Sequence, residues 1–385
     1  MSENIKRTEL NSLGEFALIE KLTKHFKANN QSTKKAIGDD AAVISNADKE
    51  TVVSTDLFIE GVHFDLSYFP LKHLGYKLVI ANISDIYAMN AIPEQITISI
   101  AVSNRFSVEA LEELYQGIEL ACENYKIDLV GGDTTSSTKG LIISVTAIGS
   151  AKKEQLAYRN GAKVGDVICV TGDLGGAYLG FQVLNREKQI HLENPNIQPD
   201  LANHQYIVGR QLKPEAKRNL IEFFSENEII PTSMIDLSDG LSSDMLHIAK
   251  QSDVGCKIYD ANLPISKEVF DQAIEFNLDP MTCALNGGED YELLFTINPK
   301  DEGMIEMSDI DVSVPSALTT FSTASTVKTV IALLESICLT TTASKSFTKI
   351  EFELKVYGEP SGVTVILPLD SFVITIEFGF AIIIF

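Results

Sequence analysis

The sequence predicts an α/β protein whose strands and helices alternate along a chain long enough for two domains. At 385 residues the chain can bury two cores of ordinary size. Its hydrophobic content of 45% and charged content of 22% are those of an ordinary globular protein. A third observation is a small polar corner, rich in aspartate and glycine, that recurs where apolar, strand-like segments end.

The first domain is expected over residues 1–150. Apolar residues recur at helical spacing in three segments, which we expect to be helices: 13–26, 74–89 and 108–125. Short apolar runs between and after these helices predict strands at 51–57, 95–102, 127–130 and 141–148. Lysine and arginine gather in the segment 149–160, where we place the domain boundary.

The second domain is expected over residues 151–313. Strands are predicted at 164–170, 233–237, 254–259 and 293–297. Helices are predicted from after Ala177 to about Leu184, at 214–224, from 241 onward and at 267–276, and the polar segment 185–203 is expected to be a surface excursion. We also expect Ser84-Asp85 and Ser238-Asp239 to lie on equivalent apolar helices in two related halves.

Residues 314–385 form a divergent tail of different texture. They are rich in threonine, serine and β-branched residues, and they contain no polar corner of the earlier kind. The last apolar run is interrupted by Asp370 and Glu377 and is too short for a membrane span. We therefore expect no membrane partner.

The net charge of −22 excludes a nucleic-acid surface, because phosphate backbones are bound by lysine and arginine patches. The five cysteines are dispersed and form no C-x-x-C pair, which is typical of reduced thiols in a cytoplasmic protein. The polar N-terminus lacks the apolar core of a signal peptide. We expect a cytoplasmic protein.

The stretch Met234–His247 is the most informative part of the chain. An apolar strand leads into Ser238-Asp239-Gly240, after which apolar residues follow at helical spacing. Asp236 and Asp239 therefore lie at a strand-to-helix corner. Asp239 is equally well explained as the N-cap of that helix. That explanation does not account for Asp236, which is still on the strand.

Other acids stand in comparable settings. Asp85 is embedded in an apolar helical run, where an unpaired carboxylate is costly to bury. Asp133 follows Gly131 and Gly132, and paired glycines let a backbone approach phosphate closely. Taken alone, Asp56 is better explained as a turn residue and His63 as a surface imidazole.

Together these acids indicate a cation site. Two carboxylates about 4 Å apart repel by roughly 4 kcal/mol at an effective dielectric constant near 20, so a converging group needs cations among its members. Oxygen ligands alone favour Mg²⁺, which proteins commonly bind together with substrate phosphates. The sequence contains no Walker A motif, protein-kinase loop or G-x-G-x-x-G. The residues thus predict a metal-dependent enzyme acting on phosphate esters or anhydrides.

Eight motifs, in order, carry a resemblance to a known family: Gly14–Phe16, Ile37–Val43, Ser54–Phe64, Ala81–Ala91, Gly131–Thr135, Arg159–Asp166, Ile235–Leu241 and Gly287–Phe295. Residues 13–300 resemble the thiamine-monophosphate kinases, relatives of aminoimidazole ribonucleotide synthetase. The resemblance implies that superfamily's two-domain α/β (α+β) fold, with a mixed C-terminal sheet and helices. It also implies a homodimer in which the N-terminal sheets pair as a barrel. The implied activity is direct, in-line phosphorylation of thiamine monophosphate by ATP, with several Mg²⁺ ions and no phosphoenzyme.

The resemblance also assigns roles to individual residues. The positions that match metal ligands are Asp40, Ser54, Thr55, Asp56, Asp85, Asp133, Asp236 and Asp239. Those that match nucleotide-binding positions are Tyr115, Gly132, Asp133, Arg159 and Ser238. His63 and Glu289 match positions that hold the thiamine phosphate. No catalytic side chain is assigned with certainty, since metals and Arg159 are expected to assist the transfer.

The chain departs from the family after about residue 310. Family members end in a glycine, an aromatic that packs on the substrate, and a His-Phe pair, but no histidine follows His247 here. Two alternatives remain open. One is a sister enzyme resembling selenophosphate synthetase or the hydrogenase-maturation member, for which the expected N-terminal or C-terminal cysteine is missing. The other is a catalytically idle nucleotide-binding protein with an aberrant tail.

Overall fold

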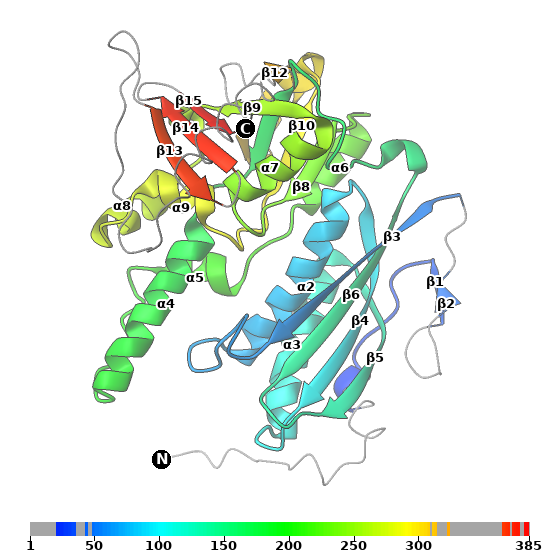
Figure 1. Cartoon of the computed structure of the whole chain (residues 1–385). Coiled ribbons are helices and arrows are strands. Elements are labelled where there is room, and N and C mark those ends of the chain that lie inside the picture. The colour runs from blue at the N-terminus through cyan, green and yellow to red at the C-terminus, as the bar shows by residue number, and fades with distance from the viewer. Residues whose placement is uncertain are drawn as a thin grey trace, which may run out of the picture.

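The structure is a computed structural model, shown in Figure 1. It describes residues 21–35, 43–44, 48–308, 310–313, 322–323, 364–369, 372–377 and 381–384. Asp40 and most of the helix expected at 13–26 lie outside these residues. Within the described part, strands and helices alternate, and the predicted α/β class is confirmed.

The N-terminal half is a four-stranded sheet with two helices against one face (Figure 1). The strand order is β3 (Glu50–Ile59), β6 (Ile142–Ala151), β4 (Ile92–Val102) and β5 (Asp128–Ser136). Neighbours are antiparallel except β4 and β5, which are parallel. The covering helices are α2 (Leu71–Ala88) and α3 (Val108–Tyr125). The short strands β1 (Thr33–Lys35) and β2 (Val43–Ile44) pair with each other.

Strand β3 shows how sequence alternation sets the two faces of this sheet. Ser54 and Asp56 are half-buried on the helix side, whereas Val53, Thr55 and Leu57 are exposed. This is the period of two that a strand with one covered face requires. The opposite face of the sheet therefore remains open in the single chain.

Helix α2 is the central element of the molecule. Fourteen of its 18 residues are buried, because it is apolar around most of its circumference and is packed on several sides. It contacts the N-terminal sheet, α3, and strands β8 and β10 of the C-terminal half. The two helices approach closely at Gly75 and Gly117, where an added Cβ would lie 2.0 Å from Leu114 O and 1.9 Å from Lys72 O, respectively.

The C-terminal half is built on an antiparallel sheet of order β11 (Val312–Ser313), β7 (Val167–Thr171), β10 (Leu293–Ile297) and β8 (Ser233–Asp236). Its helices are α4 (Gly176–Glu193), α5 (Gln205–Leu212), α6 (Arg218–Glu226), α7 (Leu241–Ser252), α8 (Lys267–Glu275), α9 (Pro280–Asn286) and α10 (Glu302–Glu306). One hydrophobic cluster runs from the N-terminal sheet through α2 to Phe224 and Phe295, so the two halves share a core.

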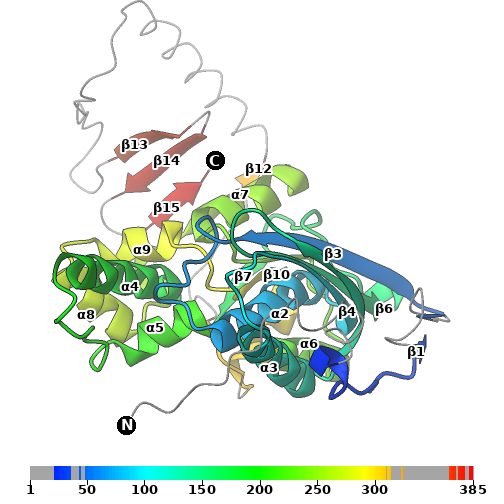
Figure 2. The same cartoon turned by 90° about the horizontal axis from the view of Figure 1, so that it is seen from below.

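A second sheet joins strands of the tail to the C-terminal half. Its order is β12 (Ser322–Thr323), β9 (Val254–Ile258), β15 (Ala381–Ile384), β14 (Phe372–Glu377) and β13 (Thr364–Leu369). Strand β15 pairs antiparallel with β9. Figure 2 shows β13, β14 and β15 at the periphery of the molecule, far from α3.

Three local predictions are wrong. Ser238 and Asp239 precede α7, which begins at Leu241, so they do not lie on a helix as Asp85 does. The strand expected at 127–130 continues through Gly131–Asp133 to the end of β5 at Ser136, because pairing with β4 outweighs the weak strand preference of glycine. Helix α4 continues to Glu193, well into the segment expected to be an excursion. No helix in the described part of the chain is both long and apolar enough to cross a bilayer.

Candidate active site

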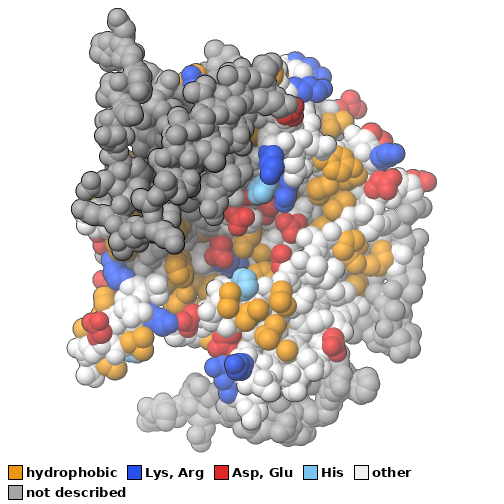
Figure 3. Space-filling view, viewed as in Figure 1, with side chains coloured by type: hydrophobic (Ala, Val, Ile, Leu, Met, Phe, Trp, Pro, Cys, Tyr) orange, Lys and Arg blue, Asp and Glu red, His pale blue; other side chains and the backbone are white. Residues whose placement is uncertain are grey.

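Three aspartates from separate elements converge where α2 meets β3 and β8. Asp85 lies on α2 and accepts a hydrogen bond of 2.5 Å from Ser54 Oγ of β3. Burial, followed by the nearby Asp85 carboxylate, raises the pKa of Asp56 to about 6 and that of Asp236 to about 8. Burial also raises the pKa of Asp85. Asp56, Asp85 and Asp236 are here called the acid cluster. Figure 3, viewed as in Figure 1, shows acidic side chains gathered near the middle of the molecule, beside the open face of the N-terminal sheet.

Arg159 and His63 border the acid cluster. The positive charge of Arg159 lowers the pKa of both Asp85 and Asp236, although burial outweighs it. His63 has the same effect on Asp56 and on Glu289, so its ring lies close enough to interact with both carboxylates. His63 Nδ1 accepts a hydrogen bond of 3.1 Å from the backbone N–H of Ile59, so Nε2 is the protonated nitrogen when the ring is neutral.

The corner that carries Asp236 is held by Asp244 of α7. The Asp244 carboxylate accepts hydrogen bonds from the backbone N–H groups of Asp239 at 3.2 Å and Gly240 at 3.1 Å. Gly240 has φ = +110°, a conformation that favours glycine. Ser238 and Asp239 are exposed at this corner. Their side chains are therefore accessible to a ligand, and the capping role falls to Asp244.

The segment Gly287–Tyr291, here called the acceptor loop, runs alongside this corner. The backbone N–H of Glu289 donates to Ser238 O at 2.9 Å, and that of Tyr291 donates to Leu237 O at 2.9 Å. Glu289 and Tyr291 have φ of +65° and +52°, which is strained for residues with side chains. Such strain persists only where surrounding contacts hold the backbone.

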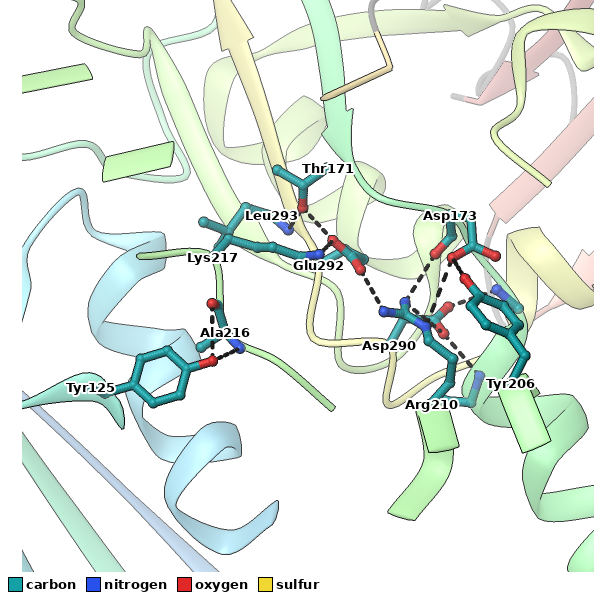
Figure 4. Close-up of polar contacts among 12 residues, drawn as sticks. Tyr125, Thr171, Asp173, Tyr206, Arg210, Ala216, Lys217, Asp290, Glu292 and Leu293 are labelled. Carbon is teal, nitrogen blue, oxygen red and sulfur yellow. Dashed lines mark hydrogen bonds and ion pairs between the residues drawn. The ribbon is translucent and has the colours of Figure 1, made fainter. Parts of the chain in front are cut away.

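A buried ion-pair network supplies some of the contacts that keep the acceptor loop in this strained conformation (Figure 4). Arg210 of α5 pairs with Glu292 at 2.8 Å and with Asp290 at 3.5 Å, and Lys217 pairs with Glu292 at 2.7 Å. Asp290 also accepts hydrogen bonds from the backbone N–H groups of Gly175 at 2.7 Å and Ala177 at 3.0 Å, at the start of α4. The network therefore anchors Asp290 of the acceptor loop and Glu292, the residue that follows the loop.

Not every predicted residue joins the acid cluster. Thr55 and Asp133 lie on the open face of the sheet, because they pair directly with Thr146 and Ser99 and not with core-facing residues. Strands β3 and β5 are opposite edges of the sheet, about 14 Å apart at the usual strand spacing. Asp133 and its neighbour Gly132 therefore cannot share a cation with Asp56 in one chain. Asp40 lies outside the described residues.

Tyr115 belongs to the core of the N-terminal half. It is buried on α3, and its ring meets that of Phe26 edge-on with centroids 6.4 Å apart. No contact described for it reaches the acid cluster.

The donor set of the acid cluster fits a divalent cation bound together with phosphate. Its ligands are carboxylate and hydroxyl oxygens, and the raised pKa values are those of negative charges that lack compensation. Among the described residues, no group of three or more His, Cys, Asp or Glu side chains forms a metal site by itself. Phosphate and water oxygens would have to complete the coordination.

Sequence reasoning missed Lys77, Arg210, Asp244 and Glu292. Lys77 had a detectable signal, since it is a charge inside the same apolar helical run as Asp85. Asp244 lies four residues after Gly240, where a helix's first turn commonly binds free N–H groups. Arg210 and Glu292 had no signal, because their partners are distant in sequence.

Comparison with known proteins identifies the family. The family model described as AIR synthase related protein, N-terminal domain, matches residues 38–151. Thiamine-monophosphate kinase of Aquifex aeolicus (strain VF5) is 34% identical over 304 residues, which is 78% of this chain and 92% of that protein. The chain belongs to the thiamine-monophosphate kinase family. The enzyme of Bacillus subtilis (strain 168) is 32% identical to this kinase over 75% of this chain and 85% of that protein.

Solved structures agree with this assignment. The crystal structure of thiamine-monophosphate kinase from Stenotrophomonas maltophilia K279a has a TM-score of 0.68 and 30% identity, covering 81% of this kinase and 95% of that chain. AaThiL complexed with AMPPCP and TMP has a TM-score of 0.62 and 29% identity, covering 84% and 94%. Hydrogenase maturation protein HypE in complex with ATP, at 17% identity, shares the fold, with a TM-score of 0.60 over 79% and 86%.

Proposed function

We propose that this kinase transfers the γ-phosphoryl group of ATP to thiamine monophosphate, forming thiamine diphosphate. The observation that carries the proposal is the acid cluster, with Arg159 beside it and His63 near both Asp56 and Glu289. Relatives named thiamine-monophosphate kinase, and the AaThiL complex with AMPPCP and TMP, support the choice of substrates.

Mg²⁺ is the proposed metal. Asp56, Asp85 and Asp236, with the Ser54 hydroxyl, would hold it on the helix side of the sheet, and Asp239 would add a ligand from the exposed corner. When bound, the metal neutralises charge that develops on the phosphates. Arg159 offers a planar fork of N–H donors suited to phosphate oxygens, and Ser238 a hydroxyl at the same corner.

We propose that the transfer is direct. The acid cluster and Arg159 would orient two phosphate groups and screen their charges, and this requires no protein nucleophile. Positioning the reacting groups and stabilising their charge is sufficient for phosphoryl transfer. Glu289 would face the cationic thiazolium ring of the acceptor, and His63 would lie near its phosphate. Tyr115, Gly132 and Asp133 stay proposed nucleotide-binding residues.

A homodimer is the proposed assembly. The open face of the N-terminal sheet exposes Val53 and Leu57, 60% and 52% exposed, beside Thr55. A second copy laid on this face would close the two sheets into a barrel and cover Thr55. The four cysteines of the described part are buried thiols, which supports a reducing, cytoplasmic location.

The test is to incubate the full chain with MgATP and thiamine monophosphate and to measure thiamine diphosphate by chromatography. Formation of product that stops when Mg²⁺ is chelated is expected. Binding of MgATP without any product would contradict the proposal and indicate an idle nucleotide-binding protein. Radiolabelled γ-phosphate retained stoichiometrically on the protein without acceptor would contradict direct transfer.

A further inference from the structure

Lys77 connects helix α2 to the acceptor loop through a buried ammonium group. The residue is 4% exposed. Its Nζ donates to Gln211 O at 2.8 Å and to Glu289 Oε2 at 3.0 Å. The aromatic rings of Phe69 and Tyr291 flank the ammonium, with centroids at 5.5 and 6.0 Å. A lysine in this position gives up nearly all its hydration, so its partners must compensate for that cost.

The same helix carries part of the acid cluster. Asp85 lies eight residues after Lys77, slightly more than two turns, so both side chains lie on one side of α2. The rise between them is about 12 Å at 1.5 Å per residue. The same side of α2 therefore contacts Glu289 through Lys77 and contributes Asp85 to the acid cluster.

Glu289 depends on this contact because its backbone is strained. Gln211 Nε2 donates to the same oxygen, Oε2, at 2.8 Å. Lys77 and Gln211 thus hold one carboxylate oxygen from the buried side. The Glu289 side chain is still 38% exposed, so the rest of the carboxylate can reach a ligand.

We propose that Lys77 is a positioning residue for the acceptor: it holds the Glu289 carboxylate ionised and fixed relative to the acid cluster on the same helix. This inference rests on the proposed function, because Glu289 is there the residue that faces the acceptor's cationic ring. The positive charge of Lys77 does not repel this acceptor. Its ring carries a charge of +1 and its phosphate a charge of −2, so the acceptor as a whole is an anion.

The charges around Glu289 give the proposal a direction. Burial alone would raise the pKa of Glu289, but Lys77 and Gln211, with a smaller effect of His63, hold it below its ordinary value. The phenols of Tyr68 and Tyr291 also face it, and their pKa values are raised, chiefly by burial. Without Lys77 the pKa of Glu289 moves upward, and the carboxylate is protonated at a higher pH.

Steady-state kinetics of the full chain test this role with Lys77→Met and a matched control, Lys72→Met, an exposed lysine on the same helix. Lys77→Met should raise KM for thiamine monophosphate about tenfold at pH 7, the usual effect of losing a buried charged hydrogen bond. KM for MgATP should not change. As pH falls, the rise in acceptor KM should begin at a higher pH in Lys77→Met than in the wild type. Lys77→Arg, which keeps the charge, should recover part of the loss.

A second readout does not require turnover. Hydrogen exchange at the backbone amides of residues 288–292 should be faster in Lys77→Met than in Lys72→Met. If the wild type makes no thiamine diphosphate, the proposed function fails, and the exchange comparison still decides whether Lys77 holds the acceptor loop. If Lys77→Met does not fold, Glu289→Gln removes the same ion pair and should raise acceptor KM while abolishing its acid dependence.

Two results would overturn the inference. One is a folded Lys77→Met protein whose acceptor KM, pH dependence and loop exchange all equal those of Lys72→Met. The other is a variant whose KM values for acceptor and MgATP rise together with no shift in pH dependence, since a general structural defect would do that.

Discussion

Asp236 shows at the scale of one residue why the acid cluster needs a cation. It is 3% exposed, and burial with the Asp85 carboxylate raises its pKa from 3.8 to about 8. A folded pKa above the unfolded value means that protonation favours folding. The contribution of Asp236 to the stability of metal-free protein should therefore be full below about pH 4 and be lost as pH rises through about 8.

Asp236→Asn should abolish turnover and yet leave metal-free protein at least as stable at pH 8. The amide removes the charge that burial penalises, and one pKa unit corresponds to about 1.4 kcal/mol. A gain of at least about 2 °C in Tm is expected in chelator at pH 8, measured by thermal unfolding. Asp253→Asn, at an exposed position after α7, is the matched control and should change neither property. Near-normal kcat of Asp236→Asn at saturating Mg²⁺ would contradict the assignment.

At the scale of elements, α2 and α3 are placed by two glycines whose backbones touch the opposite helix. Gly75→Ala would gain up to about 1 kcal/mol of helix propensity. The new Cβ, however, would lie 2.0 Å from the backbone oxygen of Leu114, which no rotamer change relieves. We expect a net loss of more than about 2 kcal/mol in the free energy of unfolding, measured with denaturant.

Gly209→Ala on α5 is the control for Gly75→Ala, since an added Cβ at Gly209 meets nothing within 4 Å. It should be neutral or stabilise by up to about 1 kcal/mol. Equal effects of the two substitutions would show that helix contact does not explain Gly75.

The ion-pair network joins α5, the start of α4 and the acceptor loop into one unit. Arg210→Met would leave the buried carboxylates of Asp290 and Glu292 without their main partner. Breaking a buried pair from one side costs about 3–5 kcal/mol, or roughly 10 °C in Tm. Lys267→Met, which removes an exposed pair with Asp271, should leave Tm unchanged when both are measured by calorimetry. A drop of only a degree or two for Arg210→Met would indicate that the network contributes little.

At the scale of the whole molecule, the open sheet face leaves apolar side chains in water on a single chain. Leu57→Glu should convert the proposed dimer into monomer, because a charge would be buried between two sheets. Sedimentation should show half the mass, with Tm lowered and turnover reduced. Phe270→Glu, on an exposed position of α8, is the control and should leave the mass unchanged. A wild type that sediments as a monomer would refute the proposed assembly directly.

The local sequence pattern was sufficient to predict most helices and strands and two members of the acid cluster. Helix 108–125 and strand 293–297 have the predicted limits, since apolar spacing repeats over their full length. An acid inside an apolar helix identified Asp85, and the strand before Gly240 identified Asp236. These signals lie within one element, where neighbours in sequence are neighbours in space.

Tertiary packing decided which of these residues meet. Lys77 reaches Glu289 across 212 positions of sequence, and Arg210 reaches Glu292 across 82. Thr55 and Ser54 are adjacent in the chain, yet the pleat of β3 puts them on opposite faces of the sheet, and Asp133 lies at the far edge. Periodicity determines that a strand has two faces. Only the register between strands and the packing of α2 against both halves determine which face receives the acids and which cations accompany them.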